Sequence, residues 1–66
     1  MSKEMPFLIL CIEEYKLHKG LSGAETMALF NKFDVCRYII ELYECLHTCG
    51  MEYIMEDIDS FIACQS

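Results

Sequence analysis

The chain has 66 residues, of which 55% are hydrophobic, and it contains one proline and three glycines. This composition excludes an intrinsically disordered chain, which is poor in apolar residues, and the length predicts a single domain over residues 1–66. The formal net charge is −6, and residues 38–66 hold six carboxylates with no lysine or arginine. Such a surface repels nucleic-acid phosphates and attracts a basic protein.

The first expected element is a helix over about Glu4 to Lys19, because Gly20 is a typical residue just beyond a helix. At about 100° per residue, one face collects apolar side chains for a core. These are Phe7, Leu8, Cys11, Ile12 and Tyr15. Ile9, Leu10 and Leu17 fall on the other side, which is more apolar than one buried stripe requires. We therefore expect Ile9, Leu10 and Leu17 to contact a partner protein or a second copy of the chain.

A second helix is expected to begin at Ser22, because Ser22 and Glu25 fit the S-x-x-E capping box. Its apolar stripe contains Thr26, Leu29, Phe30 and Phe33. Asp34 interrupts this pattern, and we interpret it as the N-cap of the helix that follows.

A third helix is expected over about Val35 to Cys49, ended by Gly50. Its main seam contains Val35, Ile39, Leu42 and Leu46. A fourth helix is expected over about Met55 to Cys64, and the preceding sequence MEYI fits either a first helical turn or an extended link. The predicted fold class is therefore all-α, a compact single domain of about four short helices.

Five cysteines raise the question of disulfides or metal binding. The apolar run from Met5 to Ile12 resembles part of a signal peptide, but no small-residue cleavage site follows it, so we expect a cytoplasmic location with reduced thiols. Cys45 and Cys49 are spaced to share a metal ion, yet His47 points away from both and no second close pair completes a zinc site. The same geometry disfavours a catalytic Cys–His dyad. We expect no metal, no cofactor, no catalytic residue and no enzyme activity.

The acidic half supplies candidate contacts for a basic partner: Glu41, Glu44, Glu56, Asp57 and Asp59. A small helix-turn-helix regulator is an alternative, because the second and third helices are joined by a very short connection. A recognition helix presents lysines, arginines or amides to DNA, whereas this one presents Arg37, Glu41 and Glu44. Nucleic acid and membrane are therefore not expected partners, and a self-associating structural protein is the other alternative.

Three stretches carry a family resemblance: KGLSGAETMALFNK, YIIELYECLHTCG and YIMEDIDSFI. They resemble a family of very short bacterial proteins catalogued as domain of unknown function 3791. This chain departs from the family pattern in its many cysteines and in Asp34, where a glycine is frequent. The resemblance implies no established activity. It implies genes that lie near those of toxin-related, ADP-ribosyltransferase-like proteins, and hence an antitoxin or accessory subunit. The expected function is a non-enzymatic protein-interaction module.

Overall fold

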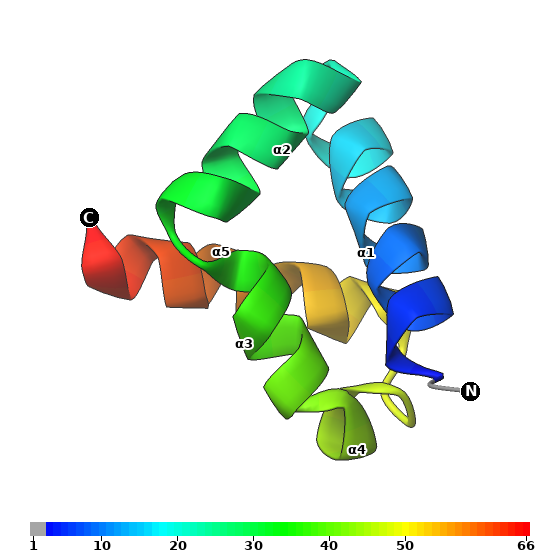
Figure 1. Cartoon of the computed structure of the whole chain (residues 1–66). Helices are drawn as coiled ribbons and strands as arrows, with labels where there is room; N and C mark the ends of the chain where they lie inside the picture. The colour runs from blue at the N-terminus through cyan, green and yellow to red at the C-terminus, as the bar shows by residue number, and fades with distance from the viewer. Residues whose placement is uncertain (1–2) are drawn as a thin grey trace.

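The computed structural model describes residues 3–66, which form five helices (Figure 1). In chain order they are α1 (Glu4–Lys19), α2 (Gly23–Lys32), α3 (Val35–Glu41), α4 (Tyr43–Leu46) and α5 (Met51–Gln65). No residue from 3 to 66 lies in a β-strand, so the predicted all-α fold class is confirmed. α1 packs against α2, α3 and α5, and α3 also packs against α5.

The first helix has the predicted bounds because its end is encoded locally. Gly20 has a φ of 67° and a ψ of 35°, the left-handed conformation that glycine adopts without a steric cost. The Gly20 amide donates to the Leu17 carbonyl and the Leu21 amide donates to the Lys16 carbonyl, which is the Schellman pattern. This turn reverses the chain and lays α2 against α1.

The capping box predicted at the start of α2 is present. The Glu25 amide donates to the Ser22 hydroxyl at 3.1 Å, and the Ser22 amide donates to the Glu25 carboxylate at 2.9 Å. The Thr26 hydroxyl, which is fully buried, donates to the Ser22 carbonyl at 2.9 Å. The buried hydroxyl of Thr26 therefore has its hydrogen-bond partner at the N-cap of its own helix.

The prediction of one continuous third helix is wrong. The helix is interrupted at Leu42, whose φ of −100° and ψ of 15° separate α3 from α4. At this point the Cys45 amide donates to the Leu42 carbonyl three residues back. Beyond Leu46 the side chains of Thr48 and Cys49 both hydrogen-bond to the Cys45 carbonyl and compete with the backbone. The spacing of apolar residues predicts which side chains share a face, but it does not predict which backbone groups form hydrogen bonds. It therefore could not predict the interruption at Leu42 or the end of α4 at Leu46.

The last helix is longer than predicted, because the MEYI segment forms its first turn. α5 begins at Met51, after an extended Gly50 with a ψ of 153°. The Ile54 amide donates to the Gly50 carbonyl at 3.1 Å. Burial of Ile54 and Met55 in the core explains why this turn is helical and docked.

Asp34 precedes α3 as predicted, but it is not a side-chain cap. Its φ of 57° places it in the left-handed region, and its carboxylate makes no cap hydrogen bond to α3. The carboxylate instead accepts from the Arg37 guanidinium at 3.4 Å. The left-handed region costs free energy for residues that carry a Cβ atom. The positive φ at position 34 therefore gives a structural reason why glycine is frequent here in the pattern that the chain resembles.

Replacing Asp34 by glycine is expected to raise the free energy of unfolding by about 0.5–1 kcal/mol, because glycine removes the Cβ strain at a positive φ. The ion pair lost to Arg37 is exposed and contributes little. Asp34→Ala is the matched control, because it removes the same charge and keeps the Cβ atom. Urea denaturation should rank glycine above both aspartate and alanine. Equal stability of the glycine and alanine variants would contradict the strain.

The core lies between the inner faces of α1, α2, α3 and α5, and α4 contributes one side chain to it, Leu46. Its buried side chains are Leu8, Cys11, Tyr15, Phe30, Val35, Ile39, Leu46, Ile54, Met55 and Ile58. Phe30 of α2 packs on Tyr15 of α1 with ring centroids 5.3 Å apart. No helix within residues 3–66 has both the length and the apolar character to cross a membrane.

Candidate interaction surfaces

α1 carries exposed apolar side chains on the face that points away from the core. Ile9 is 58% exposed, Leu10 is 47% exposed and Leu17 is 70% exposed. Met5, one helical turn before Ile9, is also exposed and was not singled out from the sequence. We call Met5, Ile9, Leu10 and Leu17 the outer face of α1. The structure thus places all three predicted residues on the surface, and their role as a contact stays a prediction.

One ion pair lies along the outer face of α1. Glu13 follows Leu10 by three residues and precedes Leu17 by four, so it lies between them on the helix surface. Its carboxylate is 3.3 Å from the Lys16 ammonium. The pair leaves this face electrically neutral, in contrast with the acidic second half of the chain.

Asp59, predicted as a contact for a basic partner, joins α5 to α1. Its carboxylate accepts a hydrogen bond from the buried Tyr15 hydroxyl at 2.7 Å and lies 2.8 Å from the Lys19 ammonium. Burial acts to raise the pKa of Asp59, but the hydrogen bonds from Lys19 and Tyr15 outweigh it and hold the pKa below its usual value. Asp59 is therefore a charged acceptor within the fold.

Asp57 has the corresponding position on the other flank of α5. It accepts a hydrogen bond from the Tyr38 hydroxyl of α3 at 2.6 Å. Burial, together with this hydrogen bond and the negative charge of Asp57, raises the pKa of Tyr38 to about 12. Asp57 and Asp59 thus face different neighbouring helices.

The three glutamates of the predicted contact set lie on the surface. Glu41 accepts from the Arg37 guanidinium at 3.0 Å. Glu44 of α4 and Glu56 of α5 are exposed, and neither side chain has a hydrogen-bond or ion-pair partner within residues 3–66. We call Glu44 and Glu56 uncompensated, because they are the acidic side chains of the predicted set that have no hydrogen-bond or ion-pair partner among the described residues.

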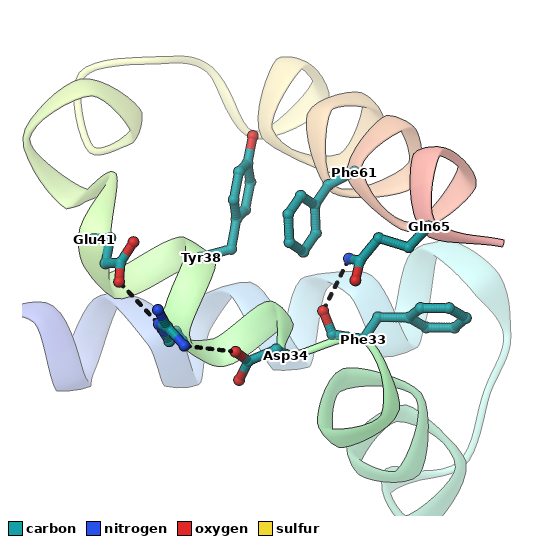
Figure 2. Close-up of a pocket in the computed structure, with 7 residues that line it drawn as sticks. Phe33, Asp34, Tyr38, Glu41, Phe61 and Gln65 are labelled. Atoms are coloured by element: carbon teal, nitrogen blue, oxygen red, sulfur yellow. Dashed lines mark hydrogen bonds and ion pairs between the residues drawn. The ribbon is translucent and has the colours of Figure 1, made fainter.

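A groove between α3 and the C-terminal part of α5 was missed by the sequence reasoning (Figure 2). It has a volume of about 280 Å³ and is lined by Phe33, Asp34, Arg37, Tyr38, Glu41, Phe61 and Gln65. The rings of Tyr38 and Phe61 stack with centroids 3.8 Å apart and planes 17° apart. The Gln65 amide nitrogen donates to the Phe33 carbonyl at 3.0 Å and joins the end of α5 to the corner between α2 and α3.

The thiols and histidines do not converge. The Cys49 thiol donates to the Cys45 carbonyl at 3.3 Å, while the His47 ring stacks on Tyr43 with centroids 4.6 Å apart. Within residues 3–66 no three histidine, cysteine or acidic side chains are grouped to hold a metal ion. Burial, reinforced by the charge of Glu14, raises the pKa of the Cys11 thiol to about 11, so this thiol stays protonated at neutral pH.

Comparison with known families gives one match, which covers most of the chain. Residues 6–64 match the family model described as "Protein of unknown function (DUF3791)". The chain belongs to this family. The match runs from the first turn of α1 almost to the end of α5. It includes Ile9, Leu10 and Leu17 of the outer face of α1 and every groove residue except Gln65. Comparison with curated proteins and with solved structures gives no match.

Proposed function

We propose that the protein is a non-enzymatic module that binds another protein, with the outer face of α1 as its hydrophobic contact. The observation that carries this proposal is the exposure of Ile9, Leu10 and Leu17 on a helix whose opposite face is core. An amphipathic helix places its apolar side chains on the one face that packs on the core, whereas α1 carries them on two sides. In the isolated chain α1 is covered on one side only.

The outer face of α1 is too small to hold a partner by itself. Burying what remains exposed of three such side chains contributes roughly 3–5 kcal/mol. Association costs an estimated ~4–15 kcal/mol in lost translational and rotational freedom. A stable complex therefore needs a second contact, and the uncompensated Glu44 and Glu56 favour one with lysines or arginines.

This charge also favours a different protein over a second copy. Two copies would each bring a net charge of −6 to the contact, and like charges oppose association. The partner class that we propose is a toxin-related, ADP-ribosyltransferase-like enzyme, with this chain as its antitoxin-like or accessory subunit. The helix-turn-helix alternative has less support, because Arg37, the single cation of α3, is already held by Asp34 and Glu41.

Leu10→Glu is expected to abolish partner binding and leave helicity nearly unchanged, because it places a charge at the centre of an apolar contact. Tyr53→Glu is the matched control, since Tyr53 is an exposed apolar residue of α5 with 56% exposure. Native mass spectrometry of the tagged protein, recovered from its host under reducing conditions, measures the complex. Circular dichroism of both variants measures the fold.

Three outcomes contradict the proposal. If Leu10→Glu unfolds the chain and Leu17→Glu retains the complex, the outer face of α1 is part of the core and not a contact. If Tyr53→Glu disrupts the complex as strongly as Leu10→Glu, the contact is not on α1. If wild-type protein is recovered only as a homodimer that Leu10→Glu dissociates, the outer face of α1 serves self-association instead.

A further inference from the structure

We propose that the groove between α3 and α5 binds an arginine side chain of a partner polypeptide. This inference rests on the proposed interaction function and adds a contact separate from Glu44 and Glu56, which do not line the groove. The groove volume of about 280 Å³ lies near the lower end of the range for small-molecule and cofactor pockets, roughly 300–1,000 Å³. It has room for one long side chain.

An aromatic wall gives the groove its affinity for a flat cation. Tyr38 and Phe61 stack with centroids 3.8 Å apart, and both residues are half-buried, so part of the stack faces solvent. The hydrogen bond from the Tyr38 hydroxyl to Asp57 fixes the ring on α5. Guanidinium groups pack on such rings through cation–π attraction. This corner of the fold already has one such contact, since the Lys32 ammonium lies 5.3 Å from the centroid of the Phe33 ring.

The charges at the groove favour a cation over an anion. Its charged lining residues are Asp34, Glu41 and Arg37, which give a net charge of −1, and the Lys32 ammonium lies nearby against the Phe33 ring. The Arg37 guanidinium pairs with both carboxylates, at 3.4 Å from Asp34 and 3.0 Å from Glu41. Dashed lines in Figure 2 end on the carboxylates of Asp34 and Glu41. Each carboxylate has a further oxygen that can accept from an incoming guanidinium. An incoming carboxylate would meet two negative groups and a cation that they already neutralise.

The probe for this site is a capped tripeptide, acetyl-Gly-Arg-Gly-amide, titrated into isotopically labelled protein and followed by two-dimensional NMR. Amide signals of Tyr38, Phe61 and Gln65 are expected to shift with the arginine peptide. The citrulline counterpart has the same shape without the charge, and we expect it to bind at least about fivefold more weakly. Equal binding of the two peptides would overturn the proposal.

Substitutions that change the charge of the groove should change the affinity for a cationic peptide and for an anionic peptide in opposite directions. Arg37→Gln makes the groove more negative and is expected to tighten binding of the arginine peptide about threefold. The pair Asp34→Asn with Glu41→Gln is expected to weaken it about tenfold, and asparagine tolerates the left-handed backbone at position 34. The control pair Glu14→Gln with Glu52→Gln removes the same charge from positions outside the groove. It is expected to leave the affinity unchanged.

Other results would overturn the proposal. If Arg37→Gln abolishes binding and the wild type prefers acetyl-Gly-Glu-Gly-amide, the groove takes carboxylates. If the control pair weakens binding as much as the groove pair, only net charge attracts the peptide. Leu10→Glu should bind the tripeptide like the wild type, because the outer face of α1 lies outside the groove. A failure at the groove is therefore distinguishable from a failure at α1.

Discussion

Replacing Phe30 by alanine is expected to lower the free energy of unfolding by about 3–5 kcal/mol, the cost of deleting a buried phenyl ring. Phe30 is fully buried and packs on Tyr15 across the interface of α1 and α2. A domain of this length has a stability of roughly 3–10 kcal/mol. The variant should therefore retain little cooperative structure, which urea denaturation followed by far-ultraviolet circular dichroism measures.

Phe33→Ala is the control for this prediction. Phe33 lies three residues further along, is only half-buried and lines the groove. Its replacement removes the same ring from a site that is already open to water, so we expect a loss less than half that of Phe30→Ala. Equal losses would mean that the core is not centred on the contact between Phe30 and Tyr15.

Replacing Asp59 by alanine is expected to lower the free energy of unfolding by about 2 kcal/mol, because the Tyr15 hydroxyl loses its acceptor inside the protein. Glu56→Ala, on the exposed side of the same helix, is the control and should cost little. In a Tyr15→Phe background the Asp59→Ala change should cost much less, because the donor is already absent. Equal costs in the two backgrounds would show that the hydrogen bond does not carry the effect.

The cost of Asp59→Ala should depend on pH in a defined direction. The pKa of Asp59 lies below its usual value in the folded chain, whereas an aspartate in the unfolded chain has a pKa of about 3.9. A lowered folded pKa contributes stability that is fully present above the unfolded pKa and is lost as the pH falls through the folded pKa. The difference between wild type and Asp59→Ala should therefore be constant near neutral pH and shrink below about pH 4.

Helix ends were predictable where the chain encodes them within a few residues. Gly20 ended α1 at the predicted residue, and the reciprocal hydrogen bonds of Ser22 and Glu25 started α2 as expected. The separation of α3 from α4 at Leu42 has no such signal. At this point the Leu42 carbonyl accepts from the amides of both Cys45 and Leu46. The apolar residues keep the same helical spacing across the interruption, so they give no sign of it.

The surfaces were predictable to the extent that they belong to one helix. Periodicity along α1 was enough to place Ile9, Leu10 and Leu17 away from the core. The groove required Tyr38 and Phe61 to meet, and they are brought together only by the packing of α3 on α5. The hydrogen bond from Tyr15 to Asp59 likewise joins residues that are far apart in the chain, so the spacing of residues along the sequence could not predict it.

The packing of α5 on α1, which includes the hydrogen bond from Tyr15 to Asp59, can form only late in synthesis on the ribosome. The inner face of α1 is completed by α5, which is made more than thirty residues after α1 ends. At about 5–20 residues per second, that interval lasts roughly 2–6 seconds. During it the outer face of α1 and the part of its inner face that α5 covers are both open to water. The nascent chain is therefore at its most aggregation-prone before α5 emerges. A partner or chaperone that covers the outer face of α1 during this interval would protect the chain before the folded domain exists.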